Sequence, residues 1–300
     1  MLALIEPRSA PALAMEDLAR DHVREDRSSG PSTQLRNFLL VSLKAAWNSV
    51  HIAMRPQLKS LTFLVTALNE EENLAATIQT ITTAVDHFDC DYEILIVDDG
   101  STDNTAAIAD QLAATNTRVR VIHNEQNLGL GGAYKRGVQH AAKDYVMWVC
   151  GDNAEIGDNL INIMSHVGQA DIIVPVLTAG GERPWLRRVA SRAFTMTVNT
   201  LFNLQVNYYN GSVIHRTDLI RQVDIRTNSF AYEAEALVKL LKQGYSYREV
   251  PYRSATYDGM FSNAMKPKNL LGVFKALAQL YLDMRRVENA KRSAPSIAGN

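Results

Sequence analysis

Acidic side chains follow directly after two apolar segments of this chain. Asp98 and Asp99 follow the run 93–97, and Asp152 comes shortly after the run 145–149. Short runs rich in β-branched residues are typical of buried strands in a parallel sheet. The carboxyl ends of such strands form the edge at which open α/β sheets bind ligands. Carboxylates at this edge could hold a nucleotide, a sugar or a divalent metal ion, because hard oxygen ligands suit Mg²⁺ and Mn²⁺.

Other polar residues near these acids have local explanations. Ser101 and Asp103 are expected to form the turn and the cap of the next helix, a role that does not explain Asp98 or Asp99. Glutamates also follow the first apolar segment, Leu61–Leu68. We expect Glu70, nearest the strand end, to contact a nucleoside, and the two glutamates after it only to cap a helix, where carboxylates suit the positive end of the helix dipole.

A glycine-rich turn precedes another expected helix. Gly129, Gly131 and Gly132 could let the backbone approach a phosphate closely, and Lys135 and Arg136 favour a diphosphate nearby. A purely structural role for the glycines is the alternative. The spacing differs from the dinucleotide fingerprint, which argues against an NAD enzyme.

Strands and helices are expected to alternate along most of the chain. This order predicts an α/β fold with a mostly parallel sheet covered on both faces. The expected strands are Leu61–Leu68, Glu93–Val97, Val119–His123, Tyr145–Val149 and Ile172–Val176, and the expected helices are Asn69–Val85, Thr102–Ala114, Gly132–Ala142, Trp185–Leu204, Tyr232–Gln243 and Asn269–Met284.

Composition narrows the class of protein. The 300 residues are enough for one large domain or two small ones. We expect a disordered tail over 1–34, an amphipathic helix over 35–58, a catalytic domain over 59–265, and a C-terminal amphipathic helix and tail over 266–300. Lys and Arg number 31 against 32 Asp and Glu, which argues against a nucleic-acid binder. Two distant cysteines favour the reducing cytoplasm, and the lack of a long apolar run implies that any membrane contact is peripheral.

The motifs together resemble those of the family-2 glycosyltransferases, most of all the dolichyl-phosphate mannosyltransferase-like, or polyprenyl-phosphate glycosyltransferase, branch. The matching segments are Ala67–Glu70, Val97–Asp103, Asn127–Ala133 and the acidic turn near Asp152, and the similarity extends from about residue 61 to 282. The resemblance implies a GT-A (Rossmann-like) nucleotide-sugar-binding fold with flanking amphipathic helices. It also implies inverting sugar transfer from a UDP- or GDP-linked donor to a polyprenyl-phosphate, lipid or glycan acceptor.

The resemblance further implies a set of site residues. The donor would be bound by Thr66, Leu68, Glu70, Asp98, Asp99, Gly131 and Lys135. Mg²⁺ or Mn²⁺ would be held by Asp152 and Glu155, and the catalytic residues would be Asp152 and Glu235. The family's Asp-x-Asp reads Cys150-Gly151-Asp152 here, so either Glu155 or Asn153 replaces the missing acid or the protein uses a metal only weakly.

The sequence does not decide between a phosphate and a hydroxyl as the acceptor group. A phosphate acceptor is already an anion, whereas a hydroxyl acceptor needs a base. Glu233 and Glu235 lie two apart and cannot share a helix face; Glu235 is preferred as the base, and a solvated helix acid is the alternative. The family's late Arg-x-x-Gly-x-Ser-Lys is replaced by 257–263, after which Lys266 and Lys268 could supply the basic groups.

Two further questions follow from these patterns. The last helix carries basic residues, so it could lie on an anionic membrane surface from the cytoplasmic side or pack on its own domain. The incomplete metal motif keeps open a non-catalytic, nucleotide-binding scaffold. A nucleotidyltransferase is disfavoured because Glu70 and the glutamates beside it would repel a triphosphate.

Overall fold

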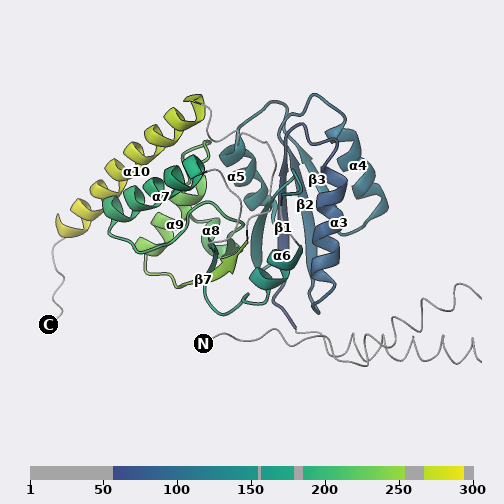
Figure 1. Ribbon diagram of the computed structural model, residues 1–300, viewed down its shortest axis with the longest axis horizontal. Helices are drawn as coiled ribbons and strands as arrows, with labels where there is room; N and C mark the ends of the chain where they lie inside the picture. The colour runs from purple at the N-terminus through teal and green to yellow at the C-terminus, as the bar shows by residue number, and fades with distance from the viewer. Residues whose placement is uncertain (1–56, 155–156, 179–184, 254–266, 294–300) are drawn as a thin grey trace, which may run out of the picture. The chain divides into compact units, whose positions relative to one another are not determined.

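The computed structural model describes residues 57–154, 157–178, 185–253 and 267–293 (Figure 1). They belong to the second of two compact units of the chain, residues 56–300. The expected tail over 1–34 and nearly all of the expected helix over 35–58 lie outside the described residues, as do Glu155 and Lys266. The domain boundaries therefore stay predictions.

The strands of this part of the chain form one mixed sheet in the order β3-β2-β1-β4-β6-β5-β7. Neighbours pair in parallel except around the short β6, which runs antiparallel to β4 and β5. Every residue of β1 and β2 is buried, as expected for apolar strands covered on both faces. The mostly parallel α/β fold is thus confirmed. The strands are β1 Leu61–Ala67, β2 Tyr92–Asp98, β3 Val119–His123, β4 Tyr145–Cys150, β5 Ile172–Leu177, β6 Ile214–Arg216 and β7 Tyr247–Tyr252.

Helices cover both faces of the sheet (Figure 1). One face carries α3 (Leu74–Val85), α4 (Thr105–Thr115) and α6 (Gly157–Met164). The other carries α5 (Leu130–His140), α7 (Trp185–Phe202) and α9 (Tyr232–Lys242), with α10 (Pro267–Ser293) packed on α7 and α9. The short α8 (Thr217–Ile220) follows β6.

Alternate residues of the strands point into the two halves of the core. In β1, Phe63 and Val65 pack with α3 and α6, whereas Leu64 packs with α5 and α9. This alternation follows from the two-residue period of a β-strand.

Some expected elements differ from those observed. The first helix begins at Leu74 rather than Asn69, because Asn69 adopts a left-handed backbone (φ 56°) and a turn precedes the helix. The strands β6 and β7 were not expected: β6 is only three residues long, and β7 is a polar edge strand that contains Pro251.

Candidate functional site

The expected acidic residues converge at one edge of the sheet. The last residues of β1 and β2 are in register, Ala67 with Asp98, and β4 pairs in parallel with β1 up to its own last residue. Glu70, Asp99 and Asp152 therefore emerge from three neighbouring strand ends at the carboxyl edge. Sequence reasoning placed these acids together correctly, because strand ends of a parallel sheet share an edge.

Glu70 and Asp152 are close enough to interact electrostatically. Burial raises the pKa of Glu70, and the charges of Asp152 and Asp103 raise it further, against a hydrogen bond of 3.0 Å from Asn73 Nδ2 that lowers it. Burial also raises the pKa of the Cys150 thiol, with the charge of Asp152 as the next cause. The ends of β1 and β4 thus concentrate negative charge, which a bound cation would offset.

A metal site built from protein ligands alone is not formed by the residues that the structure describes. No group of three or more His, Cys, Asp or Glu side chains among them is arranged to hold an ion. Asn153, one proposed replacement for the missing acid, instead accepts a hydrogen bond of 3.1 Å at Oδ1 from Thr80 of α3. Glu155, the other replacement, lies outside the described residues.

Asp98 has protein partners that the sequence did not reveal. Its Oδ1 accepts a hydrogen bond from the Ser101 backbone N–H (3.0 Å), and its Oδ2 lies 2.9 Å from His123 Nδ1 at the end of β3. The Ser101 hydroxyl, expected to cap a helix, accepts a hydrogen bond from the Asn69 N–H instead. Asp98 therefore has a structural role, because this carboxylate joins the ends of two strands.

Asp99 also holds the surrounding backbone in place. Its Oδ1 accepts hydrogen bonds from Asn124 Nδ2 (2.7 Å) and the Leu128 N–H (2.9 Å), and its Oδ2 accepts one from the Gly129 N–H (3.0 Å). Arg136, expected near a diphosphate, donates to Asn124 Oδ1 at 2.6 Å. Asp99 therefore fixes the glycine-rich turn, and Arg136 supports it through Asn124.

The glycine-rich turn packs against another part of the protein backbone. A Cβ added at Gly131 would lie 2.8 Å from the Thr227 carbonyl oxygen, and one at Gly129, where φ is 80°, would lie 2.9 Å from that of Asn228. The Gly131 N–H donates to the Asn228 carbonyl oxygen at 3.1 Å. The close approach that these glycines allow in the structure is to the loop at 227–228, which supports the structural alternative. The contact of Gly131 with the donor stays a prediction.

The residues near the start of α4 accept and donate hydrogen bonds both within their own loop and to the loop after β1. Asp103 accepts a hydrogen bond from the Thr105 N–H (2.9 Å), although Asn104 is the cap residue of α4 and its own side chain makes no capping bond. Glu71, expected to cap its own helix, accepts from the Asn104 N–H at 3.0 Å. The loops after β1 and β2 are therefore clasped together, which holds the edge in shape.

Thr66 and Leu68, both expected to contact the sugar donor, differ in their exposure to solvent. Thr66 is buried, and its hydroxyl accepts a hydrogen bond of 2.9 Å from Trp148 Nε1 in β4. Leu68, one residue past the end of β1, is 39% exposed. Leu68 is thus accessible at the edge, whereas Thr66 ties β1 to β4.

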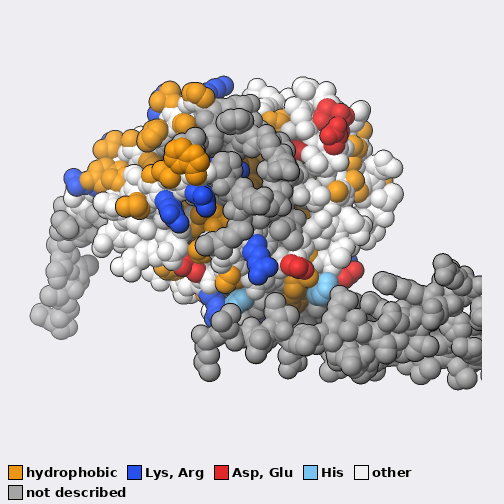
Figure 2. All heavy atoms as spheres, viewed as in Figure 1, with side chains coloured by type: hydrophobic (Ala, Val, Ile, Leu, Met, Phe, Trp, Pro, Cys, Tyr) orange, Lys and Arg blue, Asp and Glu red, His pale blue; other side chains and the backbone are white. Residues whose placement is uncertain are grey.

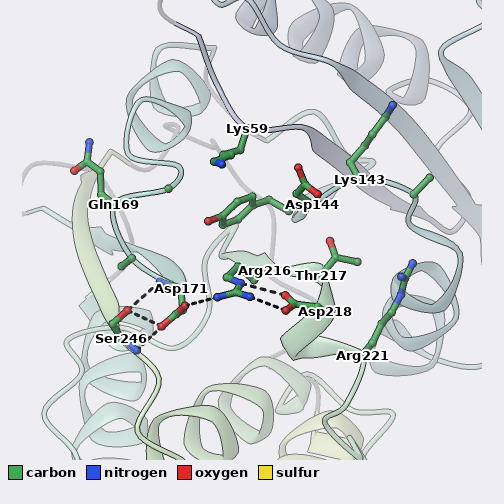
Figure 3. A pocket seen from close by; sticks show the side chains of 14 residues that line it. Lys59, Lys143, Asp144, Gln169, Asp171, Arg216, Thr217, Asp218, Arg221 and Ser246 are labelled. Carbon is green, nitrogen blue, oxygen red and sulfur yellow. Dashed lines mark hydrogen bonds and ion pairs between the residues drawn. The ribbon is translucent and has the colours of Figure 1, made fainter.

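A cavity of about 850 Å³ lies at the opposite, amino edge of the sheet (Figure 3). Its lining includes Tyr145, the first residue of β4, and Asp171, which precedes β5. Arg216 lies between Asp171 (3.1 Å) and Asp218 (2.6 Å), so its charge is already paired. None of the expected site residues lines this cavity, and we do not assign it to the donor.

The chain matches the family described as Glycosyl transferase family 2 over residues 62–226, more than half of its length. It belongs to glycosyltransferase family 2. Among curated relatives, the polyprenol monophosphomannose synthase of Mycolicibacterium smegmatis is 29% identical over 66% of this chain and 78% of the relative. The undecaprenyl-phosphate mannosyltransferase of Micrococcus luteus is 26% identical over 63% of this chain and 80% of the relative.

Solved structures of glucosyl-3-phosphoglycerate synthase from Mycobacterium tuberculosis share the fold of this family-2 enzyme. A complex with UDP has a TM-score of 0.58 and 16% identity, covering 74% of this chain and 80% of the other. A complex with Mn²⁺, UDP and phosphoglyceric acid has a TM-score of 0.57 and 18% identity, covering 74% and 78%. The GT-A fold and the glycosyltransferase class are confirmed, so the scaffold alternative is set aside.

The two glutamates of α9 have separate structural partners in this glycosyltransferase. Glu233 is 2% exposed and lies 2.7 Å from His215 Nε2, whereas Glu235 is 4% exposed. Glu235 accepts hydrogen bonds from the N–H groups of Arg226 and Thr227, both at 3.0 Å. The alternative of a solvated helix acid is wrong, because both carboxylates are buried and point to different parts of the fold.

Lys135 faces the same region as Glu235. Burial lowers the pKa of Lys135, against the charges of Glu235 and Asp224, which raise it. It lines a cavity of about 440 Å³ between α5 and α8 that also includes Asp224. Its contact with the donor diphosphate stays a prediction.

Sequence reasoning missed the residues that support the acids. His123, Asn124 and the loop at 226–228 carry no motif of their own, and the loop follows the glycine-rich turn by almost a hundred residues. The only available signal was the glycine spacing, which indicates a close approach without identifying the partner.

Proposed function

We propose that this protein transfers a sugar, with inversion, from a nucleotide-diphosphate sugar to an isoprenoid lipid phosphate at a membrane surface. The observation that carries the proposal is the convergence of Glu70, Asp99 and Asp152 at the carboxyl edge of a family-2 fold. The names of the curated relatives, a polyprenol monophosphomannose synthase and an undecaprenyl-phosphate mannosyltransferase, support this acceptor class.

The donor nucleotide would lie across the ends of β1 and β2. Glu70 and Asp99 would face the nucleoside, with Leu68 and the Asp98 turn forming the adjoining surface. Asp99 already accepts three hydrogen bonds, so about one of the roughly four acceptor positions of its carboxylate is left for a ligand. UDP is the first nucleotide to test because the solved structures of the same fold were obtained with it.

The residues present fit a divalent ion that is held partly by the substrate. Mg²⁺ commonly binds one or two carboxylates together with substrate phosphates and waters. Asp152 would supply the carboxylate, with Glu70 beside it. A cation would relieve the negative charge that adds to the effect of burial in raising the pKa of Glu70. When bound, the ion would neutralise the departing diphosphate.

A phosphate acceptor agrees with the surroundings of the expected base. A hydroxyl acceptor requires a carboxylate with a free lone pair near the attacking oxygen. Glu235 accepts from Arg226 N, Thr227 N and Lys239 Nζ, the last at 2.6 Å. A lipid phosphate needs no such base, since it is already ionised and can attack the anomeric carbon directly.

An apolar face formed by α7 and α10 would meet the membrane. Figure 2 shows hydrophobic side chains gathered over these helices, with Lys and Arg among them. We call it the α7–α10 face; its exposed members are Trp185, Val189, Met196, Leu201, Leu270, Leu271, Phe274 and Leu282, and nearby cations are Arg188, Arg192, Lys268, Lys275, Arg285 and Arg286. Apolar and cationic groups together suit an anionic lipid surface. Within the described residues, no helix has the length and apolar character needed to cross a bilayer.

The decisive experiment measures sugar transfer to a polyprenyl phosphate in anionic vesicles from UDP- and GDP-linked sugars, with Mn²⁺ or with a chelator. We expect metal-dependent transfer that Asp152→Ala abolishes and that Asp86→Ala preserves. Asp86 is an exposed acid at the far end of α3 and serves as the matched control. Transfer to a hydroxyl glycolipid but not to the lipid phosphate would overturn the acceptor assignment, and full activity of Asp152→Ala would overturn the site.

A further inference from the structure

We infer that Glu235 is a positioning residue for the donor site, acting through the loop Arg226–Asn228, and is not the catalytic base. The inference rests on the proposed donor site at the carboxyl edge. It replaces the role that the resemblance suggested for this residue and makes a structural connection between α9 and the nucleotide.

Hydrogen-bond donors occupy most of the Glu235 carboxylate. Oε1 accepts from the Arg226 N–H at 3.0 Å and from Lys239 Nζ at 2.6 Å, and Oε2 accepts from the Thr227 N–H at 3.0 Å. Three donors leave about one of the four acceptor positions, and the side chain is buried. A general base must instead reach the proton that it removes.

These hydrogen bonds hold the loop Arg226–Asn228 in place. Two successive backbone N–H groups of the loop end on one carboxylate, which fixes the direction in which the loop presents its next carbonyl groups. The Asn228 carbonyl oxygen accepts from the Gly131 N–H at 3.1 Å. Cβ atoms added at Gly129 and Gly131 would lie only 2.9 and 2.8 Å from this loop, so the two backbones leave no room for a side chain at either position.

The glycine-rich turn is connected to the proposed donor site through Asp99. The N–H groups of Leu128 and Gly129 donate to the Asp99 carboxylate. A displacement of the loop would therefore move the turn and change the direction of the Asp99 oxygen that is left for the nucleoside. Glu235 and Asp99 are thus the two carboxylates that clamp this pair of loops from opposite ends.

The two roles of Glu235 predict different kinetics. Loss of a base lowers kcat, leaves donor affinity nearly unchanged and alters the acid limb of the pH profile. Loss of a positioning residue weakens donor binding and leaves the shape of the kcat pH profile intact. Calorimetry with Mn²⁺ present should therefore measure the Kd for UDP and for GDP. Steady-state kinetics should measure kcat and the KM for the donor.

Glu235→Gln is the principal variant. We expect its donor Kd to rise about tenfold, the scale of one charge-assisted hydrogen bond, with a smaller change in kcat and the same pH profile. Glu249→Gln is the matched control, because Glu249 also accepts from a loop backbone N–H, that of Asn207 at 2.7 Å. The atoms nearest to Cβ positions added at Gly129, Gly131 and Gly132 do not come from that loop. We expect its donor Kd to equal that of the wild type.

Gly131→Ala tests the same contact from the other side, in case Glu235→Gln folds poorly. It should weaken donor binding to a similar degree, and the double variant should be weaker by less than the product of the two effects, as for residues sharing one contact. An unchanged donor Kd in Glu235→Gln with a kcat loss of a hundredfold or more would overturn the inference. Failure of the wild type to bind either nucleotide would instead overturn the proposed function on which it rests.

Discussion

Asp98 and Asp99 are adjacent in the sequence, yet they hold different parts of the structure. Asp98 joins the β2 turn to His123 of β3, whereas Asp99 holds Asn124 and the turn at Leu128 and Gly129. Acids at these strand ends therefore shape the site. Replacing an acid can therefore lower activity either by removing a ligand contact or by loosening the loops.

The difference between Asp99 and Asp152 can be measured as stability. Asp99→Asn places an amide against N–H donors, so we expect a loss of about 1–3 kcal/mol in the free energy of unfolding, the cost of unsatisfied buried donors. Asp152→Ala should cost about 1 kcal/mol or less, because it removes the acceptor of the Ala154 N–H (3.1 Å) but also a charge that, after burial, raises the pKa of Glu70. Urea denaturation without ligand tests both; equal losses in the two variants would contradict this division of roles.

His123 is expected to make stability depend on pH. The hydrogen bond with Asp98 is the main cause that raises the pKa of His123, followed by burial, which lowers it, and by Asp110, which raises it. A raised pKa means that the folded state binds the proton more tightly than the unfolded state. The stabilisation is therefore fully present below the unfolded value of about 6.5 and is lost as pH rises through the folded value.

The measurement is the difference in unfolding free energy between wild type and His123→Gln at pH 5.5 and at pH 8.5. We expect the wild-type advantage to be larger at pH 5.5, by less than about 1 kcal/mol because the imidazole is 41% exposed and its charge is screened. A larger advantage at pH 8.5 would reverse the sign of the argument.

At the scale of elements, α10 has an inner and an outer side. On its inner side, Leu277 and Leu280 of α10 are buried in the core, and Asp283 forms an ion pair with Arg226 at 2.8 Å. Phe274, by contrast, is 67% exposed. The helix is thus attached to the loop Arg226–Asn228 on one side and is free to meet lipid on the other.

The outer side of α10 should determine vesicle binding. We expect Phe274→Asp to weaken co-sedimentation with anionic vesicles at least about tenfold, because burying a phenylalanine contributes roughly 1.5–3 kcal/mol. Ala114→Asp, an exposed position on α4 across the sheet, is the control and should bind as the wild type does (Figure 1). Equal binding by Phe274→Asp would exclude the α7–α10 face as the contact.

Local patterns predicted these elements to different extents. The five expected strands correspond to β1–β5, and the apolar runs of β1 and β2 record burial on both faces. The short β6 holds only three residues, too few for a periodic signal. The strand-end acids were also predictable, whereas the contact between Gly131 and the loop at 227–228 was not, since sequence separation hides which distant backbone a glycine approaches.

At the scale of the whole molecule, the carboxyl edge is assembled from distant parts of the chain. Strand ends supply Glu70, Asp99 and Asp152, and the loop before α9 supports the glycine-rich turn before α5. A ligand bound at this edge would touch segments that separate on unfolding. Binding of the donor should therefore stabilise the global fold and not only a local loop.

The size of this stabilisation depends on the nucleotide and on the metal ion. A nucleotide at one hundred times its Kd should add about 2.7 kcal/mol to the free energy of unfolding. If a divalent ion bridges Asp152 and the diphosphate, chelation should remove most of the gain at the same nucleotide concentration. Asp152→Ala should show the small gain with or without Mn²⁺, and Asp86→Ala should behave like the wild type. Urea titrations with UDP and with GDP measure this directly, and an equal gain with chelator and with Mn²⁺ would show that the nucleotide binds without metal.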